Sequence, residues 1–370
     1  MNNGIVLGIF TFGILIISTI SQIVAFKAGQ KDIYLGIRIP YEEIENSKLK
    51  YIGKSYVLFN IIFGIPLAIL ISYYVYITDN SIAYLVAIFA FIFFDFLNYY
   101  YHNRKVYKLK KKEGWLKTKK QEIIIDTSFN KQKKEKMIAG NKWFVISLVF
   151  VIICLVVNII QYPNIPHRYP SHWNISGNIT GYSIKTYFAI FSTPINQLIL
   201  ILITFFIYKI TFWSKNEINT NVSIENNIKF RNVWGIYIII LNFVMQIVLL
   251  IDDFQTIQLI KENISLINII IIVITMLVTL VSLVIGFKVG QGGSKLKANE
   301  GKREIAINMR DDDKYWKMGN LIYYNTNDPS IFVQKRFGIG WTVNVGSRGG
   351  QIFYAIIIIF IIVSLSIGKK

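Results

Sequence analysis

The sequence predicts an all-α polytopic membrane protein with about eight transmembrane helices and a small cytoplasmic module before the last helix. Of its 370 residues, 53% are apolar and only 16% are charged, whereas soluble globular chains average roughly 25% charged residues. The apolar residues gather in blocks of about 18 to 25, long enough to cross a hydrocarbon layer about 30 Å thick. This pattern excludes a large soluble core. A secreted disulfide scaffold is also excluded, because the single cysteine, Cys154, lies inside a block.

Eight apolar blocks mark the predicted spans. We place them at residues 4–26, 56–77, 81–101, 142–161, 187–208, 232–251, 265–287 and 351–368. Of the 40 Lys and Arg residues, 35 lie in the first, third, fifth and seventh of the segments that connect the predicted spans. Because cationic loops are retained in the cytoplasm, we expect these segments inside and both termini outside the cell membrane. The net charge of +19 is then mostly a topology signal, and no nucleic-acid partner is expected.

The spans divide the chain into four regions. Residues 1–141 form an N-terminal three-helix membrane region with a basic loop, and residues 142–288 form a four-helix membrane region with an ordered outer loop at 162–186. Residues 289–350 form a cytoplasmic module, and residues 351–370 form the last helix. The basic loop is densest at residues 104–120. Such a cluster is attracted to anionic lipid by about 1 kcal/mol per cation, so we expect it along the inner leaflet. A solvated charged helix is the alternative.

The cytoplasmic module begins with a glycine-rich stretch, residues 290–294, whose spacing does not fit a phosphate-binding loop. We interpret this stretch as a flexible exit from the bilayer. Residues 320–325 and 331–335 are short β-favouring runs on either side of a turn signal. They predict a small β-containing module packed against the membrane.

Asp95 is the one acidic residue predicted to lie at depth within a span. An ionisable group in hydrocarbon costs at least about 2.5 kcal/mol and normally faces a bundle interior or a water-filled cavity. Asp95 is therefore a candidate for ion or proton coupling. The alternative is that it reaches the inner interface and pairs with Arg104 or Lys105.

Catalytic patterns are missing from the sequence, and we expect neither an enzyme nor a bound metal or cofactor. There is no His-Glu-x-x-His motif, no pair of aspartates on facing spans and no nucleophile elbow. Only three histidines exist, and His102 is placed at the inner interface, apart from the other two.

The long outer loop carries the strongest functional signal. It holds three of the seven prolines and two of the three histidines, together with turn-forming Gly and Asn residues. Fixed turns without Lys-rich filler predict an ordered loop and a recognition surface. The candidate ligand-binding residues are His167, Arg168, Pro170, His172, Trp173, Asn174, Gly177 and Gly181. The alternative is a structural cap on two spans, with aromatic residues anchoring it at the outer interface.

Residues 170–177 read Pro-x-His-x-Asn-x-x-Gly, and Gly36, Arg38 and Pro40 lie in a Gly-Ile-Arg-x-Pro stretch. These two elements resemble signatures of SdpI-like bacterial membrane proteins. Here the order of the two elements is reversed, and Ile39 replaces the usual Thr. A third stretch resembles a C-terminal module of related proteins. Its matching residues are Tyr324, Asn325, Pro329, Arg336, Gly340 and Trp341.

The resemblance implies an immunity and signalling role, because the best-known proteins of that family protect the cell from a peptide toxin and relay its presence to a cytoplasmic repressor. We therefore expect recognition of an extracellular peptide toxin or of envelope stress, with a cytoplasmic regulator as a second partner. The alternative is a small-molecule or ion-coupled transporter, since eight spans could enclose a pathway and Pro66 and Pro194 could break helices near its midplane.

Overall fold

The computed structural model describes residues 3–78, 80–115, 140–174, 176–215, 224–297 and 311–367, and it confirms the predicted fold class. Seven helical segments in these ranges are long and apolar enough to cross a membrane. They are Gly4–Lys27, Ser47–Thr78, Ile82–Lys112, Lys142–Asn164, Ser192–Trp213, Glu225–Thr256 and Ile264–Gly293. The eighth predicted block forms α11 (Arg348–Ile367), an apolar helix of 20 residues.

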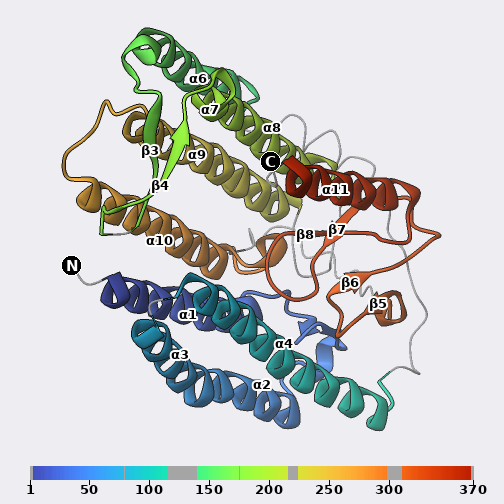
Figure 1. Ribbon diagram of the computed structural model, residues 1–370. Coiled ribbons are helices and arrows are strands. Elements are labelled where there is room, and N and C mark those ends of the chain that lie inside the picture. Colours follow the sequence, from blue (N-terminus) through green and yellow to red (C-terminus); the bar gives the residue numbers. More distant parts are fainter. Residues whose placement is uncertain are drawn as a thin grey trace.

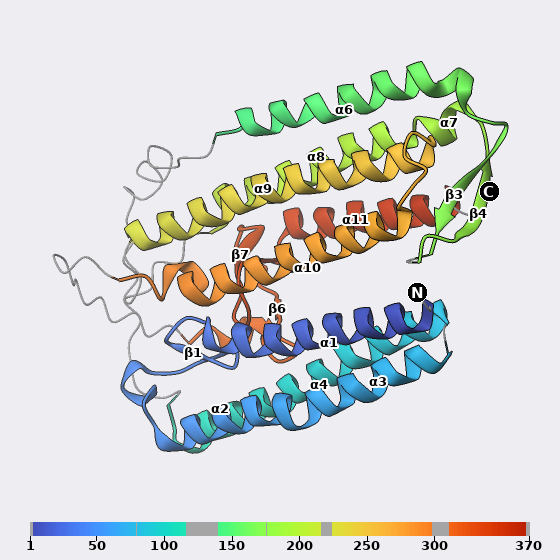
Figure 2. The same ribbon diagram turned by 90° about the vertical axis from the view of Figure 1, so that its left-hand side faces the viewer.

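The helices lie in two groups (Figure 1, Figure 2). The N-terminal group consists of α1 (Asn3–Lys27), α2 (Ser47–Phe59), α3 (Ile65–Thr78) and α4 (Ser81–Lys112). The second group consists of α6 (Lys142–Gln161), α7 (Tyr187–Ile190), α8 (Ser192–Trp213), α9 (Ile224–Thr256) and α10 (Ile264–Val289). α11 begins beside α8, where the rings of Phe206 and Phe353 stack. α10 contacts both α9 and α1 and so joins the two groups.

Four antiparallel strand pairs complete the described fold. They are β1 (Ile33–Tyr34) with β2 (Ile37–Arg38), β3 (Arg168–Trp173) with β4 (Ile179–Ile184), β5 (Trp316–Lys317) with β6 (Ile322–Tyr323), and β7 (Phe332–Gln334) with β8 (Trp341–Val343). The short 3₁₀ turns are η1 (Tyr41–Glu43), η3 (Tyr162–Asn164), η4 (Gln291–Gly293) and η5 (Asp313–Tyr315). The strands β5 to β8 form the predicted module before the last helix, and a bridge between Tyr323 and Asn344 joins its two pairs.

The second membrane segment is continuous but contains a π-helical turn, η2 (Asn60–Gly64), between α2 and α3. Pro66 is the second residue of α3, which follows this turn. Proline has no N–H group, so the carbonyl one turn earlier loses its α-helical donor and the helix widens locally. The break predicted for this span is therefore a widened turn within one helix.

The fifth predicted span is displaced along the chain. The helix α8 begins at Ser192 and ends at Trp213, whereas we predicted residues 187–208, because the chain changes direction at Phe191 after the short α7. Pro194 consequently lies in the first turn of α8. The N–H groups of a first turn have no helical acceptor, so Pro194 fits there without breaking the helix.

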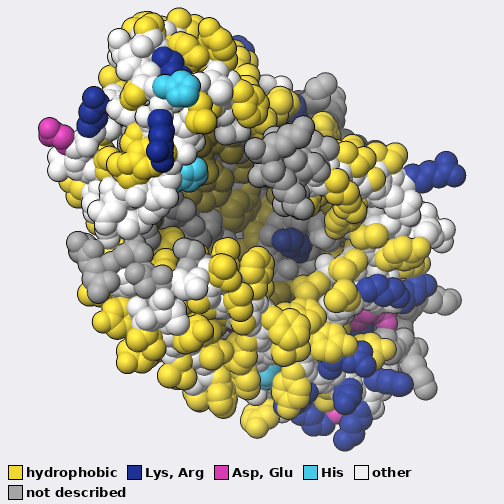
Figure 3. Space-filling view, in the orientation of Figure 1, with side chains coloured by type: hydrophobic (Ala, Val, Ile, Leu, Met, Phe, Trp, Pro, Cys, Tyr) yellow, Lys and Arg dark blue, Asp and Glu magenta, His cyan; other side chains and the backbone are white. Residues whose placement is uncertain are grey.

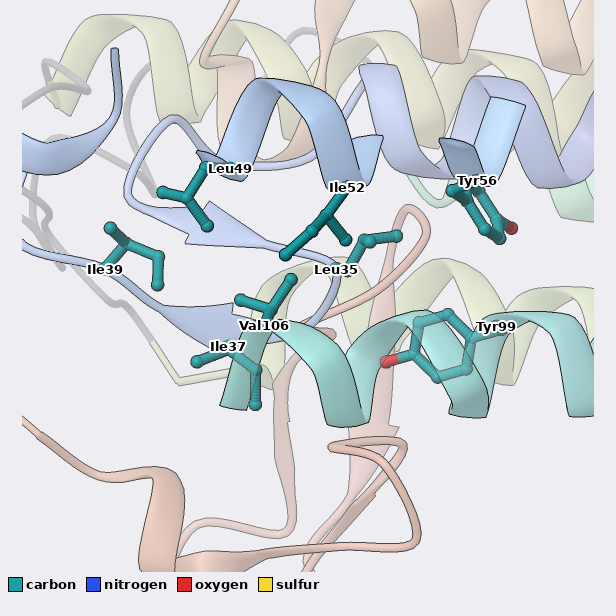
Figure 4. Close-up of a cluster of buried hydrophobic side chains, with 8 residues drawn as sticks. All are labelled: Leu35, Ile37, Ile39, Leu49, Ile52, Tyr56, Tyr99 and Val106. Atoms are coloured by element: carbon teal, nitrogen blue, oxygen red, sulfur yellow. The ribbon is translucent and has the colours of Figure 1, made fainter. Parts of the chain in front are cut away.

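Figure 4 shows a buried apolar cluster at one end of the N-terminal group. Its members are Leu35, Ile37, Ile39, Leu49, Ile52, Tyr56, Tyr99 and Val106. Each fully buried aliphatic side chain of this size stabilises the fold by roughly 1.5–3 kcal/mol. The cluster therefore holds the β1–β2 hairpin firmly between α2 and α4.

The start of α1 and the end of α11 lie at the same end of the bundle as the β3–β4 hairpin, and we call this end the hairpin end (Figure 2). The opposite end, where α4 finishes at Lys112, is called the module end because β5 to β8 lie towards it. This arrangement agrees with the alternation of the predicted spans.

We expect the hairpin end to face outward from the cell. In a Cys154→Ser background, which keeps a donor near Asp253, Thr180→Cys should react with an impermeant thiol reagent in intact cells. Lys317→Cys should react only after lysis, because its loop belongs to the cation-rich side. Both native side chains are exposed, so failure to react reports orientation. Labelling of Lys317→Cys in intact cells would reverse the topology.

Candidate functional site

The tip of the β3–β4 hairpin is a tight turn docked on α10. The N–H of Asn178 donates to Asn174 Oδ1 at 2.8 Å, and Asn268 Nδ2 donates to the Asn174 carbonyl at 3.1 Å. Gly177 has a φ of +82°, and a Cβ there would lie 2.9 Å from the backbone nitrogen of Ser265 at the start of α10. Asn174 and Gly177 therefore shape the turn and fasten it to α10.

The base of the hairpin packs on the ends of α6, α8 and α9. Tyr169 is buried in a cluster with Ile165, Ile190 and Ile257. Burial raises the pKa of Tyr169, although its bond to Ser183 opposes the rise. The outer loop is thus anchored at both its base and its tip.

Three candidate ligand-binding side chains, those of His167, Arg168 and His172, are exposed on the hairpin. The guanidinium of Arg168 lies over the ring of Tyr182, with 4.7 Å between Cζ and the ring centroid. This stacking holds the cation on the hairpin surface without neutralising its charge.

His172 sits beside an irregularity in the strand pairing. Its Nδ1 lies 3.0 Å from Ser171 Oγ, and a Cβ at Gly181 would lie 3.2 Å from the same nitrogen. Gly181 therefore leaves room for the imidazole. Pro170 and Trp173, the remaining candidates, are half-buried in β3.

Two carboxylates beneath the hairpin lie beyond residue 251, where we predicted that the sixth span ends. α9 continues to Thr256, so Asp95 is not the only acidic residue inside a long helix. Asp253 is 1% exposed and accepts hydrogen bonds from Cys154 Sγ at 3.2 Å and Asn158 Nδ2 at 3.4 Å. Asp252 is exposed and interacts electrostatically with His172. The N–H of Ile257 still donates to the Asp253 carbonyl at 2.9 Å, so helical hydrogen bonding extends past both aspartates, a continuation that the apolar pattern did not signal.

The face that carries the hairpin is hollowed at its centre. Figure 3 shows this hollow between the hairpin and the N-terminal helices, with mostly hydrophobic side chains along its wall and a Lys or Arg side chain in its depth. An apolar recess with a few polar groups is the usual form of a ligand site.

Asp95 lies in the interior of the N-terminal group and is 2% exposed. Its Oδ2 accepts a hydrogen bond from Ser18 Oγ at 2.7 Å. The alternative pairing with Arg104 or Lys105 is wrong, because these residues lie about 14 and 15 Å further along α4. Their cations lie over the rings of Tyr107 and Tyr101 instead.

Gly36 makes the turn between β1 and β2 and packs against α4. Its φ is +83°, and a Cβ there would lie 3.2 Å from Asn103 Nδ2. Asn103 Nδ2 donates to the carbonyls of Leu35 at 2.7 Å and Gly319 at 3.1 Å. One side chain of α4 thus ties this turn to the C-terminal module. Pro40, the last residue of the element, precedes η1.

Arg38 and Arg336 come from the second and third stretches of family resemblance, and they share one carboxylate. Arg38 Nε lies 3.1 Å from Asp312 Oδ1, and Arg336 Nη2 bonds the same oxygen. Arg336 Nη1 also pairs with Asp313 at 3.1 Å, while Arg38 Nη1 pairs with Asp32 at 2.8 Å. The structure therefore brings these two stretches together in one buried ionic cluster.

Lys110 joins the ionic cluster from α4. Its Nζ donates to Asp311 Oδ1 at 3.0 Å and to Asp313 Oδ2 at 2.7 Å, and the residue is 2% exposed. It is thus not part of a lipid-facing surface. The exposed cations at 104–115 are Arg104, Lys108, Lys111 and Lys112. Residues 116–120 of the predicted lipid-binding stretch lie outside the described residues.

The turn before β7 is built on Asn325, Asp328 and Asn344. Asn344 Oδ1 accepts from the N–H of Asn325 at 3.0 Å, and Asn344 Nδ2 donates to the Asp328 carbonyl at 2.8 Å. Burial alone would raise the pKa of Asp328, but its bonds to Lys215 and Ser330 hold the pKa below its ordinary value. Tyr324 and Pro329, which belong to the same resemblance, are exposed.

Residues 290–294 are buried, and their interpretation as a flexible exit is wrong. The side-chain amide of Gln291 accepts from the Gly340 N–H and donates to the Gly340 carbonyl, each at 2.7 Å. The backbone N–H of Gln291 donates to the Ala28 carbonyl at 2.7 Å. Gly293, with a φ of +88°, packs on the backbone of Asn226. Trp341, next to Gly340, packs on Phe230 of α9, with 5.5 Å between ring centroids. This turn is the junction of α1, α9, α10 and the module.

Two family models match parts of the chain. The domain of unknown function DUF1648 matches residues 149–198, which run from α6 through the hairpin into α8. The family of unknown function DUF5808 matches residues 326–351, which run from the turn before β7 to the start of α11. Neither is specific to the SdpI-like proteins. No curated protein and no solved structure shows significant similarity to the chain.

Proposed function

We propose that this multi-pass membrane protein recognises a hydrophobic peptide, such as a toxin that acts on the cell envelope, at its hairpin end. The observation that carries the proposal is the anchored hairpin. Asn174 and Gly177 fix its tip on α10, while Arg168 and His172 remain exposed. A surface that is already rigid binds a ligand with little loss of conformational entropy.

The hairpin offers a chemistry suited to an extended peptide. Its sheet has two strands, so within the described chain each strand keeps one edge without a neighbouring strand. A peptide can add to such an edge through main-chain hydrogen bonds. Ile179, Tyr182 and Ile184 are exposed along β4 and supply apolar contacts beside that edge.

The resemblance to SdpI-like proteins supports an immunity role of this kind, with a cytoplasmic regulator held at the module end. The match to DUF1648 covers the hairpin, so the matched region includes the residues that we propose for recognition.

The proposal is tested by deleting the gene and exposing the cells to a panel of hydrophobic peptide toxins. Deletion should increase killing by at least one peptide. Restoring the gene with Arg168→Ala or His172→Ala should leave the amount of folded membrane protein unchanged but reduce protection at least tenfold, because only exposed contacts are removed.

Asn174→Ala serves as the matched structural control. It removes the acceptor for the Asn178 N–H, so it should lower the amount of folded protein and the protection together. If Arg168→Ala and His172→Ala behave like this control, the hairpin is a structural cap. If neither changes protection, recognition takes place elsewhere.

Ion-coupled transport is a second candidate function, and the placement of Asp95 favours it. A carboxyl group inside a membrane bundle, with no cation within salt-bridge distance in the described chain, is typical of coupling sites in transporters. Uptake of a labelled ion into proteoliposomes tests this candidate separately from peptide protection.

A further inference from the structure

The interior of the N-terminal group contains a carboxylate that is incompletely bonded at bilayer depth. Asp95 lies about 21 Å from the first residue of the 32-residue α4, close to the middle of the helix. Ser18 donates to Oδ2, but the buried Oδ1 has no hydrogen-bond partner. Buried polar atoms are normally paired, so this carboxylate oxygen requires a partner, such as an ion or a water molecule.

Asn98 lies one turn further along the same face of α4. It is 4% exposed, and neither its Oδ1 nor its Nδ2 has a hydrogen-bond partner. Residues three apart on a helix are neighbours, so the Asn98 amide and the Asp95 carboxylate are adjacent. Two neighbouring buried side chains thus leave oxygen atoms unpaired in the same place.

The third wall of this site is the π-helical turn of the second span. A Cβ at Gly64 would lie 3.4 Å from Thr19 Oγ1, which places the turn against the residue after Ser18. Such turns recur at functional sites, and irregular helix backbone inside transporters often supplies carbonyl ligands to cations. α1, α4 and this turn all contact one another, so three spans meet in the part of the bundle that holds Asp95.

We propose that Asp95, Asn98 and Ser18 form a binding site for a small monovalent cation, sodium. All three residues offer oxygen atoms, which are the ligands of hard cations. A monovalent ion neutralises the single carboxylate, whereas a divalent ion would leave a net charge in hydrocarbon. The described residues contain no cluster of three His, Cys, Asp or Glu side chains, so a transition-metal site is not favoured.

The cation site lies in the N-terminal helix group and the hairpin belongs to the other group, so loss of sodium binding and loss of peptide protection are separate results. Its titratable neighbours are Tyr56, which interacts electrostatically with Asp95, and His102, two turns along α4. His102 already contacts the Asn98 carbonyl at 2.9 Å and Ser55 Oγ at 3.1 Å. Neither residue supplies a cation bonded to Asp95.

The test uses the full chain purified into lipid nanodiscs. Melting is followed in sodium chloride and in choline chloride at equal ionic strength, and binding of radioactive sodium is measured directly. We expect sodium to raise the Tm by several degrees in a saturable manner, with one ion bound per chain. Asp95→Asn should abolish the binding, and Asn98→Ala should weaken it at least tenfold.

Asp253→Asn is the matched control, because Asp253 is also buried in a long helix but has both oxygens bonded. It should leave sodium binding unchanged. If Asp95→Asn fails to fold, Ser18→Ala replaces it, with the same expected weakening. Equal melting in both salts without bound sodium would overturn the site. A Tm that rises only when the pH is lowered, and not when sodium is added, would also overturn the site, because Asp95 would then bind a proton and not sodium.

Discussion

Asp312→Ala is expected to lower the free energy of unfolding by about 3–5 kcal/mol, the usual cost of removing one partner from a buried ion pair. Asp312 is 4% exposed and is bonded by both Arg38 and Arg336. Its loss leaves two guanidinium groups buried beside fewer carboxylates. The C-terminal module should then separate from the β1–β2 hairpin, which thermal melting in detergent and tryptic cleavage after Arg336 will report.

Lys48→Ala is the matched control for Asp312→Ala. The ion pair of Lys48 and Glu113, at 2.6 Å, is shorter than that of Arg38 and Asp312, at 3.1 Å, but the Lys48 side chain is 61% exposed. Solvent screens such a pair, so the stability should hardly change. An Asp312→Ala protein as stable and as resistant to trypsin as the Lys48→Ala protein would show that the ionic cluster does not hold the module.

Gly293→Ala should destabilise the protein by about 2–5 kcal/mol through two separate effects. A left-handed backbone costs a residue with a Cβ about 1–2 kcal/mol, and forced overpacking adds about 1–3 kcal/mol. The new Cβ would lie 2.8 Å from the Asn226 carbonyl carbon, and backbone there cannot move aside cheaply. The Tm and the yield of folded protein in detergent measure the effect.

Gly338→Ala separates the two effects. Gly338 has nearly the same φ, +83°, but nothing lies within 4 Å of a Cβ placed there. Gly338→Ala should therefore lower the free energy of unfolding only by the cost of the left-handed backbone, about 1–2 kcal/mol. Equal losses in the two variants would mean that the contact between Gly293 and Asn226 is loose and that residues 290–294 do not form a tight junction.

The membrane fold could be predicted from the sequence because the apolar blocks are a local property of the chain. The ends of the spans were harder to place. α9 continues through Asp253 because tertiary hydrogen bonds from Cys154 and Asn158 compensate a carboxylate that hydropathy alone excludes. α8 begins late because the chain turns at Phe191, and no apolar window records a change of direction.

The contacts between distant stretches could not be predicted from residue pattern alone. Arg38 and Arg336 are almost 300 positions apart, and only their resemblance to family motifs marked both of them. Residues 290–294 looked flexible because glycine permits many conformations. The single conformation they adopt is selected by Ala28, Asn226 and Gly340, which come from three other parts of the chain.

The helix α10 connects the hairpin end of the molecule to its module end. Its first turn holds the hairpin tip through Ser265 and Asn268, and the junction turn at 290–294 follows its last residue directly. Along its 26 residues, the buried positions Gly286 and Val289 both lie near the module end. α10 is therefore one continuous helix about 39 Å long that contacts the hairpin at its first turn and leads into the junction turn at its last residue. A displacement of the hairpin along this axis would thus act on Gln291 and the junction turn.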